Sequence, residues 1–465
     1  MTPRPDLSQL SSADKDALIV VLWERVDELE RRLGLNSTNS GKPPASDGLK
    51  KPSRVNNQRE ATGKKSGGQA GHGGTTLRQV ETPDTVIDHY PAACAGCGAD
   101  VSAAQATGHQ KRQVFDLPPP VVVVTEHRAY QCWCEACGTT TLGTFPAAVT
   151  APTQYGERVA ALVVYLQAWH FLPEDRLAEL VADVFGLPVA PATIATMGQR
   201  KAQELAGLAT HIEEQVKHAS VKHLDETGYR IAGVLQWLHV ASTGLLTCYR
   251  TTRKRGAMWV GLCGIIVHDF WRPYFTLVGV LHALCNAHHL RELKALMDIE
   301  QEPWAREMHR FLRQTCHAVH LARVRDQEVS PRFRAWLEAR YDRIVAHGFA
   351  FHEGQPPLVA SGTTRRGRRR RRTGHNLLIR LRDQKAAALR FLSDPTVPFT
   401  NNQAERDLRM MKVRQKISGG FRSEGGAQTF ATLRTVLSTA RKQGWNILAT
   451  LSTPSATLIQ NLRTS

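Results

Sequence analysis

The chain has 465 residues, of which 42% are hydrophobic and 22% charged, so it is an ordinary globular sequence with room for roughly two to four domains. Its formal net charge of +18 is not ordinary and favours a polyanionic partner, with nucleic acid the first expectation. No apolar stretch reaches membrane-spanning length, and the early Asp6, Asp14 and Asp16 argue against a signal peptide.

For the N-terminal domain, residues 1–34, the sequence pattern predicts one helix over residues 14–33. Its apolar residues recur at intervals of three and four: Leu18, Val21, Leu22, Val26, Leu29 and Leu33. Ser12 suits an N-cap, and Gly34 suits a stop. The pattern fits a short coiled coil, and so self-association, although fewer than three heptads leave a simple surface helix equally compatible.

Residues 35–75 form a basic segment with too few apolar residues to build a core. Its positive residues stand among Gly, Ser and Asn: Lys50, Lys51, Arg54, Arg59, Lys64 and Lys65. This composition predicts disorder in the isolated chain. The segment is either a plain linker or an arm that lies on phosphates, and the charge of the whole chain supports the arm at least equally.

Residues 76–150 contain two Cys-x-x-Cys pairs, Cys94 with Cys97 and Cys134 with Cys137. Each pair can aim two thiolates at one tetrahedral ion, and four thiolates close a structural Zn²⁺ site. The β-rich sequence between the pairs, at 113–115 and 121–130, predicts a DNA-binding zinc ribbon with long strands.

Cys132 leaves the register of the second pair open, because it could replace Cys134 as a ligand. Cys134 is preferred, since Cys-x-x-Cys-Gly then occurs in both pairs. A redox role has little support, because no thioredoxin-like pattern of strands and helices surrounds the pairs. The other four cysteines lie in apolar or helical contexts, which suits buried thiols in a reducing compartment.

Residues 151–215 predict a helical region. An amphipathic helix over 174–185 is followed by a break at Gly186-Leu-Pro-Val189 and a second helix from 190 to about 208. Two helices joined by a short Gly-containing turn have the helix-turn-helix outline. Any pair of packed helices gives a similar pattern, so the spacing leaves DNA reading by this region open.

Residues 216–296 predict strands followed by a helix. An apolar approach leads to the adjacent Asp225 and Glu226, and further strands are predicted at 231–241, 245–251, 264–269 and 278–284, the third of them ending at Asp269. Gly228 and Gly233 are expected bends. Strand alternation turns Glu226 away from the face of Asp225, so a structural contact with Thr227 or a nearby Arg is expected for it.

Glu405 is predicted on a helix that Thr400 or Asn401 can cap. Two strand-borne aspartates and a helix-borne glutamate are what two-metal phosphoryl transfer needs, because oxygen ligands suit Mg²⁺ or Mn²⁺. Taken singly, Asp269 could be a turn residue and Glu405 a partner of Arg409. Taken together in a basic chain with a zinc module, the three carboxylates favour the metal site.

The separation of Asp269 from Glu405 is too long for one strand and one helix, which predicts a helical insertion over residues 297–392. Its expected core is Trp304, Phe311, Trp336 and Tyr341. An arginine-rich run at 364–373, with Arg368, Arg369 and Arg370, is either a solvated loop or a clamp on the DNA backbone, and the charge of the chain favours the clamp.

Residues 393–465 are expected to complete the catalytic core with C-terminal helices, one of them over 429–443. A second basic cluster directly follows Glu405 and would hold a polyanion beside the carboxylates: Arg406, Arg409, Lys412, Arg414 and Lys416.

The sequence resembles transposases of the insertion-sequence 66 family, and the motifs that carry the resemblance span nearly the whole chain in the expected order. They are Asn36-Ser-Thr-Asn-Ser-Gly-Lys-Pro-Pro44, the two Cys-x-x-Cys pairs, Asp225-Glu-Thr-Gly228, Val267-His-Asp269, Cys285-Asn-Ala-His-His-Leu-Arg-Glu-Leu293 and Asn401-Asn-Gln-Ala-Glu-Arg-Asp-Leu-Arg409. The resemblance implies a multidomain α+β protein of the DDE class, with a ribonuclease-H-like α/β core interrupted by the helical insertion.

The resemblance also implies residue roles. Asp225, Asp269 and Glu405 would be the catalytic triad that holds two Mg²⁺ or Mn²⁺ ions. Cys285 and His288 would form the Cys-x-x-His element found beside the second aspartate in such transposases. His288 would contact the scissile phosphate or the leaving group, and a helix-capping histidine is the alternative.

The resulting expectation is a DNA transposase that hydrolyses phosphodiesters at the ends of its element and joins the freed strand to target DNA. Its expected partners are DNA, a second protomer and small companion proteins of the same element, in a bacterial cytoplasm at the nucleoid. Two alternatives stay open: a catalytically inactive zinc-containing DNA-binding protein derived from a transposase, and a nuclease without strand transfer.

Overall fold

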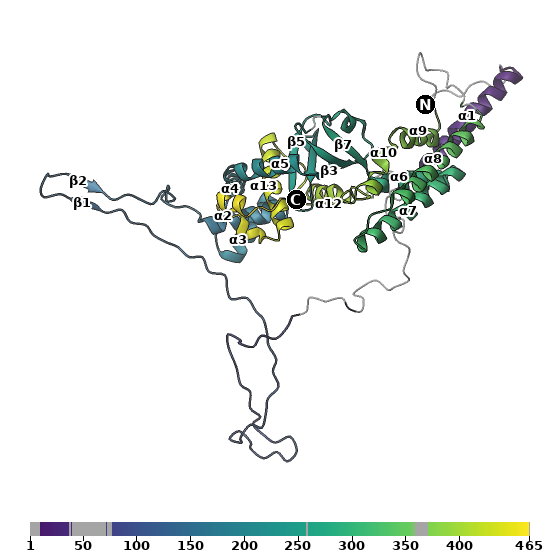
Figure 1. Ribbon diagram of the computed structural model, residues 1–465. Helices are drawn as coiled ribbons and strands as arrows, with labels where there is room; N and C mark the ends of the chain where they lie inside the picture. Colours follow the sequence, from purple (N-terminus) through teal and green to yellow (C-terminus); the bar gives the residue numbers. More distant parts are fainter. Residues whose placement is uncertain are drawn as a thin grey trace.

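The computed structural model describes residues 10–36, 39, 71, 77–256, 259–356, 358 and 371–464. The positive residues predicted for the basic arm and the arginine-rich run lie outside the described residues: Lys50, Lys51, Arg54, Arg59, Lys64, Lys65, Arg368, Arg369 and Arg370. Figure 1 shows a central sheet with one group of helices on its left, a second group on its right, and a long excursion of the chain away from both. The molecule is therefore a mixed α+β protein.

The sheet has five strands in the order β5-β4-β3-β6-β7. β3 (Val221–Ile231), β4 (Val234–Ser242) and β5 (Thr247–Thr252) form an antiparallel meander. β6 (Gly264–His268) and β7 (Val280–Leu284) continue the sheet, β6 parallel to β3 and β7 parallel to β6. β3 thus lies at the centre of the sheet, between β4 and β6.

Two glycines of the meander have different roles. Gly233 has a φ of +83° and makes the turn between β3 and β4, as predicted. The bend predicted at Gly228 is wrong, because this residue lies inside β3 and pairs with Trp237. A Cβ at Gly228 would stand 3.0 Å from the Leu235 side chain, so glycine here relieves crowding within a continuous strand.

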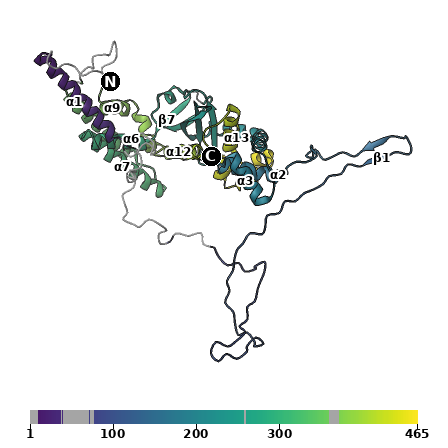
Figure 2. The same cartoon turned by 180° about the vertical axis from the view of Figure 1, so that it is seen from behind.

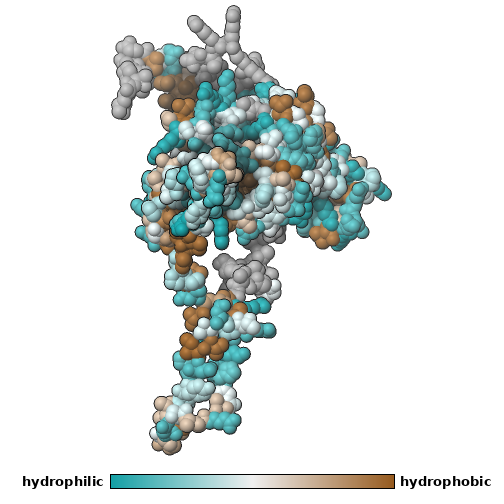
Figure 3. Space-filling model, turned by 90° about the vertical axis from the view of Figure 1, so that its left-hand side faces the viewer, coloured by the Kyte–Doolittle hydropathy of each residue, from teal (hydrophilic) through white to brown (hydrophobic). Residues whose placement is uncertain are grey.

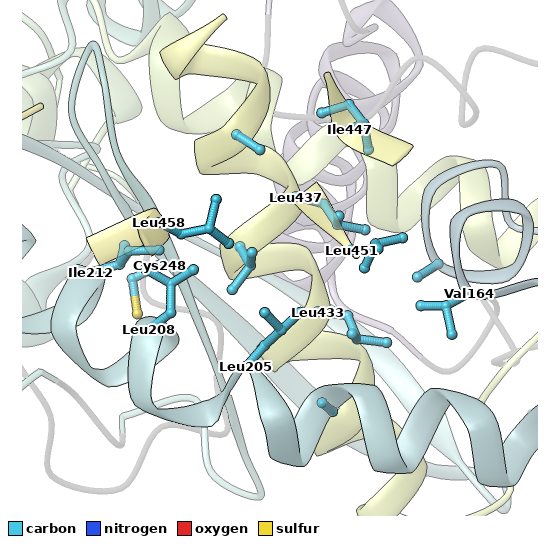
Figure 4. Packing of buried hydrophobic residues seen from close by; sticks show 14 of the residues in the cluster. Val164, Leu205, Leu208, Ile212, Cys248, Leu433, Leu437, Ile447, Leu451 and Leu458 are labelled. Carbon is cyan, nitrogen blue, oxygen red and sulfur yellow. The ribbon is translucent and has the colours of Figure 1, made fainter. Parts of the chain in front are cut away.

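The helices that cover one face of the sheet come from two separate parts of the chain, residues 157–218 and 424–460. They are α2 (Glu157–Val164), the π-helix η3 (Tyr165–Trp169), α3 (Glu174–Phe185), α4 (Pro191–Glu204), α5 (Ala206–His218), α13 (Glu424–Gln443), α14 (Ile447–Thr450) and α15 (Ser455–Gln460). α3 has the predicted bounds, whereas the second predicted helix is divided at Leu205. Leu205, Leu433 and Leu437 share one hydrophobic core (Figure 4), so the helical region packs as one body with the sheet.

α12 (Asn402–Ser418) packs against the opposite side of β3 and β4. Its Leu408 and Met411 share a core with Tyr229 and Val240. Because Tyr229 and Asp225 are both odd-numbered residues of one strand, Asp225 also faces α12.

The stretch between β7 and α12 is helical, and its role as an insertion into a catalytic core stays a prediction. After the short helix η4 (Arg272–Thr276) and β7 come α6 (Asn286–Asp298), α7 (Pro303–Val324), α8 (Pro331–Glu353), α9 (Thr373–Asp383), α10 (Lys385–Ala388) and α11 (Arg390–Ser393). Trp304, Phe311 and Tyr341 are buried in its core as expected. The same expectation for Trp336 is wrong, because this side chain is 52% exposed and stacks on Phe333 at the surface.

α1 (Ser12–Gly34) is the predicted N-terminal helix. Its N-cap is Ser11 and not Ser12, since the Ser11 hydroxyl accepts a hydrogen bond from the Asp14 N–H at 3.2 Å. Seen from behind, α1 lies beside the insertion helices and projects past them (Figure 2). Most of its apolar side chains are exposed in the single chain: Ile19, Val20, Val21, Leu22, Trp23, Val26, Leu29 and Leu33. Self-association through this helix stays a prediction.

The zinc region forms little regular structure. β1 (Gln131–Trp133) and β2 (Thr140–Leu142) pair antiparallel around the second cysteine pair. The long strands predicted at 113–115 and 121–130 are wrong, because these described residues form no strand. Val121, Val123 and Val124 are at least 80% exposed. In Figure 3, hydrophobic side chains gather along the narrow part of the molecule that extends below the packed helices and sheet. No helix in the described part of the chain is long and apolar enough to cross a membrane.

The environment of Glu300, just past α6, leads us to expect that the stability of the folded protein depends on pH. Burial and the neighbouring Glu302 raise the pKa of Glu300 to about 7 from an ordinary value of 4.5. As pH rises between these values, the unfolded state ionises while the folded state keeps its proton, so the folded state loses stability. We expect Glu300→Gln to raise the urea midpoint at about pH 8 and to change it little at about pH 5.

The matched control for Glu300 is Glu328→Gln, which changes an exposed glutamate between α7 and α8. This variant should unfold at the same urea concentration as the parent protein at both pH values. Equal midpoints for Glu300→Gln and the parent at about pH 8 would contradict the assigned shift.

Candidate active site

Asp225 lies in the middle strand of the sheet, on the face covered by α12. Its Oδ1 accepts a hydrogen bond from the Glu226 N–H at 2.9 Å. The pKa of Asp225 is raised well above its usual value, first by burial and then by the charges of Glu226, Asp269 and Glu405. The site therefore holds a buried carboxyl group surrounded by other carboxyl groups.

Asp269 directly follows β6, at the end of this strand. β3 and β6 pair in parallel as far as His223 opposite Val267, and Asp225 and Asp269 each come two residues after this last pair. The Asp269 Oδ1 accepts from the Trp271 N–H at 3.0 Å, which fixes the carboxylate as the chain turns away from the sheet. Burial is the main cause that raises the pKa of Asp269.

Glu405 comes from the first turn of α12. Its Oε1 lies 3.9 Å from Nδ1 of His288 and 3.9 Å from Nη2 of Arg291, both on α6. This oxygen is buried and has no hydrogen-bond partner among the described residues. Glu405 thus approaches the sheet from a different layer of the fold, near enough for its charge to raise the pKa of Asp225, although no grouping of three metal-ligand atoms among the described residues unites it with both aspartates.

The three carboxylates fit a site for hard divalent cations. They supply oxygen ligands only, which Mg²⁺ and Mn²⁺ prefer. Burial and mutual repulsion disfavour the ionised aspartates, and a bound cation would offset both effects. Asp225, Asp269 and Glu405 are the residues that would hold such ions.

His288 and Cys285 stand at the start of α6. Burial, with Arg291 and Arg380, lowers the pKa of His288 to about 3, so its imidazole is neutral at neutral pH. Cys285 occupies the N-cap position, and α6 has no side-chain capping hydrogen bond within the described residues, so the helix-capping alternative for His288 has no support. Burial raises the pKa of the Cys285 thiol to about 12.

Glu226 faces the other side of the sheet and is held there. Its Oε1 lies 2.6 Å from Nη2 of Arg255, and its other carboxylate oxygen accepts a hydrogen bond from the Tyr274 hydroxyl. The Arg255 guanidinium lies 4.3 Å from the centre of the Trp271 ring. Glu226 therefore makes the structural contact with an arginine that strand alternation predicts.

Asn401 joins the elements that carry the site, and the sequence did not indicate this beyond a capping position. Its Nδ2 donates to the Leu224 carbonyl at 2.7 Å, and its Oδ1 lies 2.9 Å from the His223 Nδ1. Its backbone N–H donates to Sγ of Cys285 at 3.1 Å. This one buried residue thus connects β3, the start of α6 and the start of α12.

The basic residues after Glu405 do not all reach the surface. Arg406, Arg409 and Lys412 are exposed along α12. Arg414 is not a free phosphate contact as predicted: its guanidinium lies 3.7 Å from the centre of the Phe421 ring and donates to the Gly419 carbonyl. The prediction for Arg414 is therefore corrected, because its side chain packs under the turn that ends α12.

The two cysteine pairs adopt the same local turn. The Cys94 N–H donates to Ala99 O and the Gly98 N–H to Cys94 O, and the same two bonds recur at Cys134 with Thr139 and Gly138. Cys132 instead lies in β1, opposite Thr141. Within the described residues no grouping of three or more metal ligands includes a thiol from either pair, so each pair is formed locally while the four thiols are apart.

Three stretches of the chain match known protein families. Residues 152–429 match the family described as Transposase IS66 family, and residues 91–138 match the zinc-finger binding domain of transposase IS66. Residues 2–78 match a family of unknown function (DUF6444). No curated protein matches the chain. The first match covers more than half of the chain and includes all three carboxylates, and the second includes both cysteine pairs.

Proposed function

The chain belongs to the IS66 family of transposases, and we propose on that premise that Asp225, Asp269 and Glu405 are its catalytic triad. The two family matches support a transposase that carries a zinc-finger domain and has DNA as its partner. The observation that carries the proposal is the placement of the three carboxyl groups. Asp225 lies within β3, Asp269 directly follows the neighbouring parallel strand β6, and Glu405 lies in the first turn of α12, where its charge raises the pKa of Asp225. Three half-buried carboxyl groups placed in this way, in a chain of net charge +18, suit phosphoryl transfer on a polyanion.

The five-stranded sheet is proposed to be a ribonuclease-H-like core. Its antiparallel meander followed by two parallel strands, in the order β5-β4-β3-β6-β7, supports this assignment. Of the proposed aspartates, Asp225 lies on the first strand of the sheet in chain order, and Asp269 directly follows the fourth. Helices α7 to α11 are then an insertion between the part that carries Asp269 and the part that carries Glu405.

The proposed chemistry depends on how the protein positions its own groups. Two bound Mg²⁺ or Mn²⁺ ions would activate the attacking oxygen and stabilise the leaving oxygen of an in-line displacement. Asp225 presents its carboxylate from β3 and Glu405 from the first turn of a helix, whereas Asp269 directly follows β6 and is fixed by the Trp271 N–H. His288 is neutral and stands beside Glu405, where it can donate a hydrogen bond to the scissile phosphate.

Strand transfer is proposed to use the same site as hydrolysis. Water would attack the phosphodiester at the element end and free a 3′-hydroxyl, which would then attack a phosphodiester of target DNA. The exposed Arg406, Arg409 and Lys412 on α12 would contact DNA phosphates beside the carboxylates. Pairing of two protomers through the exposed apolar residues of α1, and small companion proteins, complete the proposal.

The proposal is tested by incubating the full chain with Mg²⁺, DNA that carries the ends of its element, and a target plasmid. The assay scores cleavage and joining separately. Both products are expected, and both should disappear when EDTA removes Mg²⁺. Cleavage without joining would support a nuclease without strand transfer, and binding without cleavage would support the inactive DNA-binding protein.

The zinc finger gives a separate prediction. We expect Cys94→Ser or Cys134→Ser to release one Zn²⁺ per chain and to weaken binding to element-end DNA by at least about tenfold, because the folded finger depends on its metal. Zinc content is measured by metal analysis and DNA binding by fluorescence anisotropy.

Cys132→Ser is the matched control for the finger. Cys132 lies in β1, outside the turn made by Cys134 and Cys137, so this variant should keep its zinc and its DNA affinity. Loss of zinc from Cys132→Ser together with its retention in Cys134→Ser would reverse the ligand assignment.

A further inference from the structure

One grouping of metal-ligand atoms among the described residues includes Glu405 of the proposed triad. The ligand atoms of Cys285, His288 and Glu405 are all within 4.8 Å of one another. Nδ1 of His288 and Oε1 of Glu405 lie 3.9 Å apart, and both atoms are buried without a hydrogen-bond partner among the described residues. Buried polar atoms without partners cost free energy, so this pair points to a ligand between them.

The donor set of this grouping differs in kind from that of the triad. It offers one thiol, one imidazole and one carboxylate, and neither Asp225 nor Asp269 belongs to it. Thiolate and imidazole ligands favour ions such as Zn²⁺ over Mg²⁺. Three protein ligands with a fourth position for water is a usual arrangement for zinc.

The distances suit such an ion. Tetrahedral zinc with metal–ligand bonds of about 2.0–2.3 Å places its ligand atoms roughly 3.3–3.6 Å apart. The 3.9 Å between His288 and Glu405 therefore needs to close only slightly. Side-chain rotation can supply a movement of this size without moving either helix.

The backbone around the grouping is fixed by hydrogen bonds. The Asn286 N–H donates to Phe399 O at 3.1 Å, and the Asn286 side chain donates to Ala388 O at 2.9 Å. These bonds hold the start of α6 against the chain that leads into α12. The Asn401 N–H that donates to Sγ of Cys285 would in addition stabilise a metal-bound thiolate.

We propose that Cys285, His288 and Glu405 form an inhibitory site for a Zn²⁺-class cation, separate from the zinc finger. Occupation of this site would draw the Glu405 carboxylate toward α6 and leave Asp225 and Asp269 without their third oxygen ligand. The binding site rests on the geometry alone, whereas the inhibition rests on the proposed function of the triad.

Binding is tested in the full chain after Cys94, Cys97, Cys132, Cys134 and Cys137 have all been changed to Ser, so that finger thiols give no signal. Cd²⁺ is the probe, and the ultraviolet thiolate-to-metal absorption is the readout. We expect one Cd²⁺ per chain, with the absorption lost on adding Cys285→Ser and kept on adding Cys316→Ser, a half-buried thiol on α7.

A second variant distinguishes the loss of a metal ligand from a folding defect in Cys285→Ser. His288→Ala keeps the thiol, so the absorption should remain while the Cd²⁺ dissociation constant rises at least about tenfold. An absorption that survives Cys285→Ser, or a dissociation constant unchanged in His288→Ala, overturns the site.

Inhibition is tested by titrating Zn²⁺ into the Mg²⁺-supported cleavage reaction of the chain with its natural finger. The half-inhibitory Zn²⁺ concentration, taken relative to each variant's own rate, should rise at least about tenfold in Cys285→Ser and stay unchanged in Cys316→Ser. Equal inhibition of all three proteins overturns the inhibitory role. If the chain does not cleave DNA, the proposed function fails, and the Cd²⁺ titration still decides the binding site.

Discussion

Asp225→Asn, Asp269→Asn and Glu405→Gln should each lower Mg²⁺-dependent cleavage of element-end DNA by about a thousandfold or more. Each substitution keeps the size of the side chain and removes one anionic ligand from a site that neutralises developing charge. Loss of about 4 kcal/mol of transition-state stabilisation corresponds to a thousandfold in rate. Single-turnover cleavage of end-labelled DNA measures the effect.

The substitutions should leave DNA binding nearly unchanged, because the carboxylates repel DNA phosphates and the neighbouring basic residues remain. Slightly tighter binding is expected for the two aspartate variants, since each removes a negative charge at a buried group that other carboxyl groups surround. Fluorescence anisotropy in the absence of Mg²⁺ measures binding. Full cleavage by any one variant would remove that residue from the triad.

Two carboxylates outside the triad serve as controls. Glu424→Gln changes an exposed residue of α13 that pairs with Arg253, and it should cleave at the parent rate. Glu226→Gln changes the neighbour of Asp225, whose side chain is only 1% exposed and is paired with Arg255. Because this change breaks a buried ion pair on the other face of β3, it should lower the unfolding midpoint far more than it lowers cleavage.

The strands that carry the site could be predicted because their signals are local. Apolar runs bounded by glycines locate β3, β4, β6 and β7 to within a few residues, and each proposed aspartate follows or interrupts such a run. The length between Asp269 and Glu405 likewise predicts the insertion, because one strand and one helix need far fewer residues. Such patterns place Asp225 within one strand and Asp269 at the end of another, and the parallel pairing of β3 with β6 makes these two strands neighbours.

Contacts between distant parts of the chain could not be predicted in the same way. The Arg255 partner of Glu226 lies in the loop after β5, and Asn401 reaches β3 across most of the catalytic region. Neither residue has a local pattern that names its partner. The predicted strands of the zinc region failed for a related reason: β-branched residues such as Val121 and Val123 form a ladder only with a partner strand and a core, and here both are exposed.

The exposure of Trp336 follows from the spacing of the buried residues in α8. The buried residues of α8 include Leu337, Tyr341, Ile344 and Val345, which recur at threes and fours. Trp336 precedes this series by one residue and therefore points away from α7. Size and aromatic character predict burial for Trp336, whereas the helical period of α8 assigns it to the surface.

Asn401→Ala should lower both the stability of the protein and the affinity of its active site for Mg²⁺. The substitution leaves the Leu224 carbonyl and the His223 Nδ1 buried without their partner. At roughly 1–3 kcal/mol for each of the two groups, we expect a loss of about 2–6 kcal/mol in the free energy of unfolding, measured by urea denaturation.

The effect on Mg²⁺ separates a positioning role from a purely structural one. Asn401 fastens the start of the helix that carries Glu405 to the strand that carries Asp225, so its loss should let the two carboxylates separate. The Mg²⁺ concentration for half-maximal cleavage should then rise at least about tenfold, the usual effect of removing a residue that orients metal ligands. Asn402→Ala, at the exposed neighbouring position, should change neither quantity. A protein that is destabilised by Asn401→Ala but keeps its Mg²⁺ requirement would show that Asn401 supports the fold without positioning the triad.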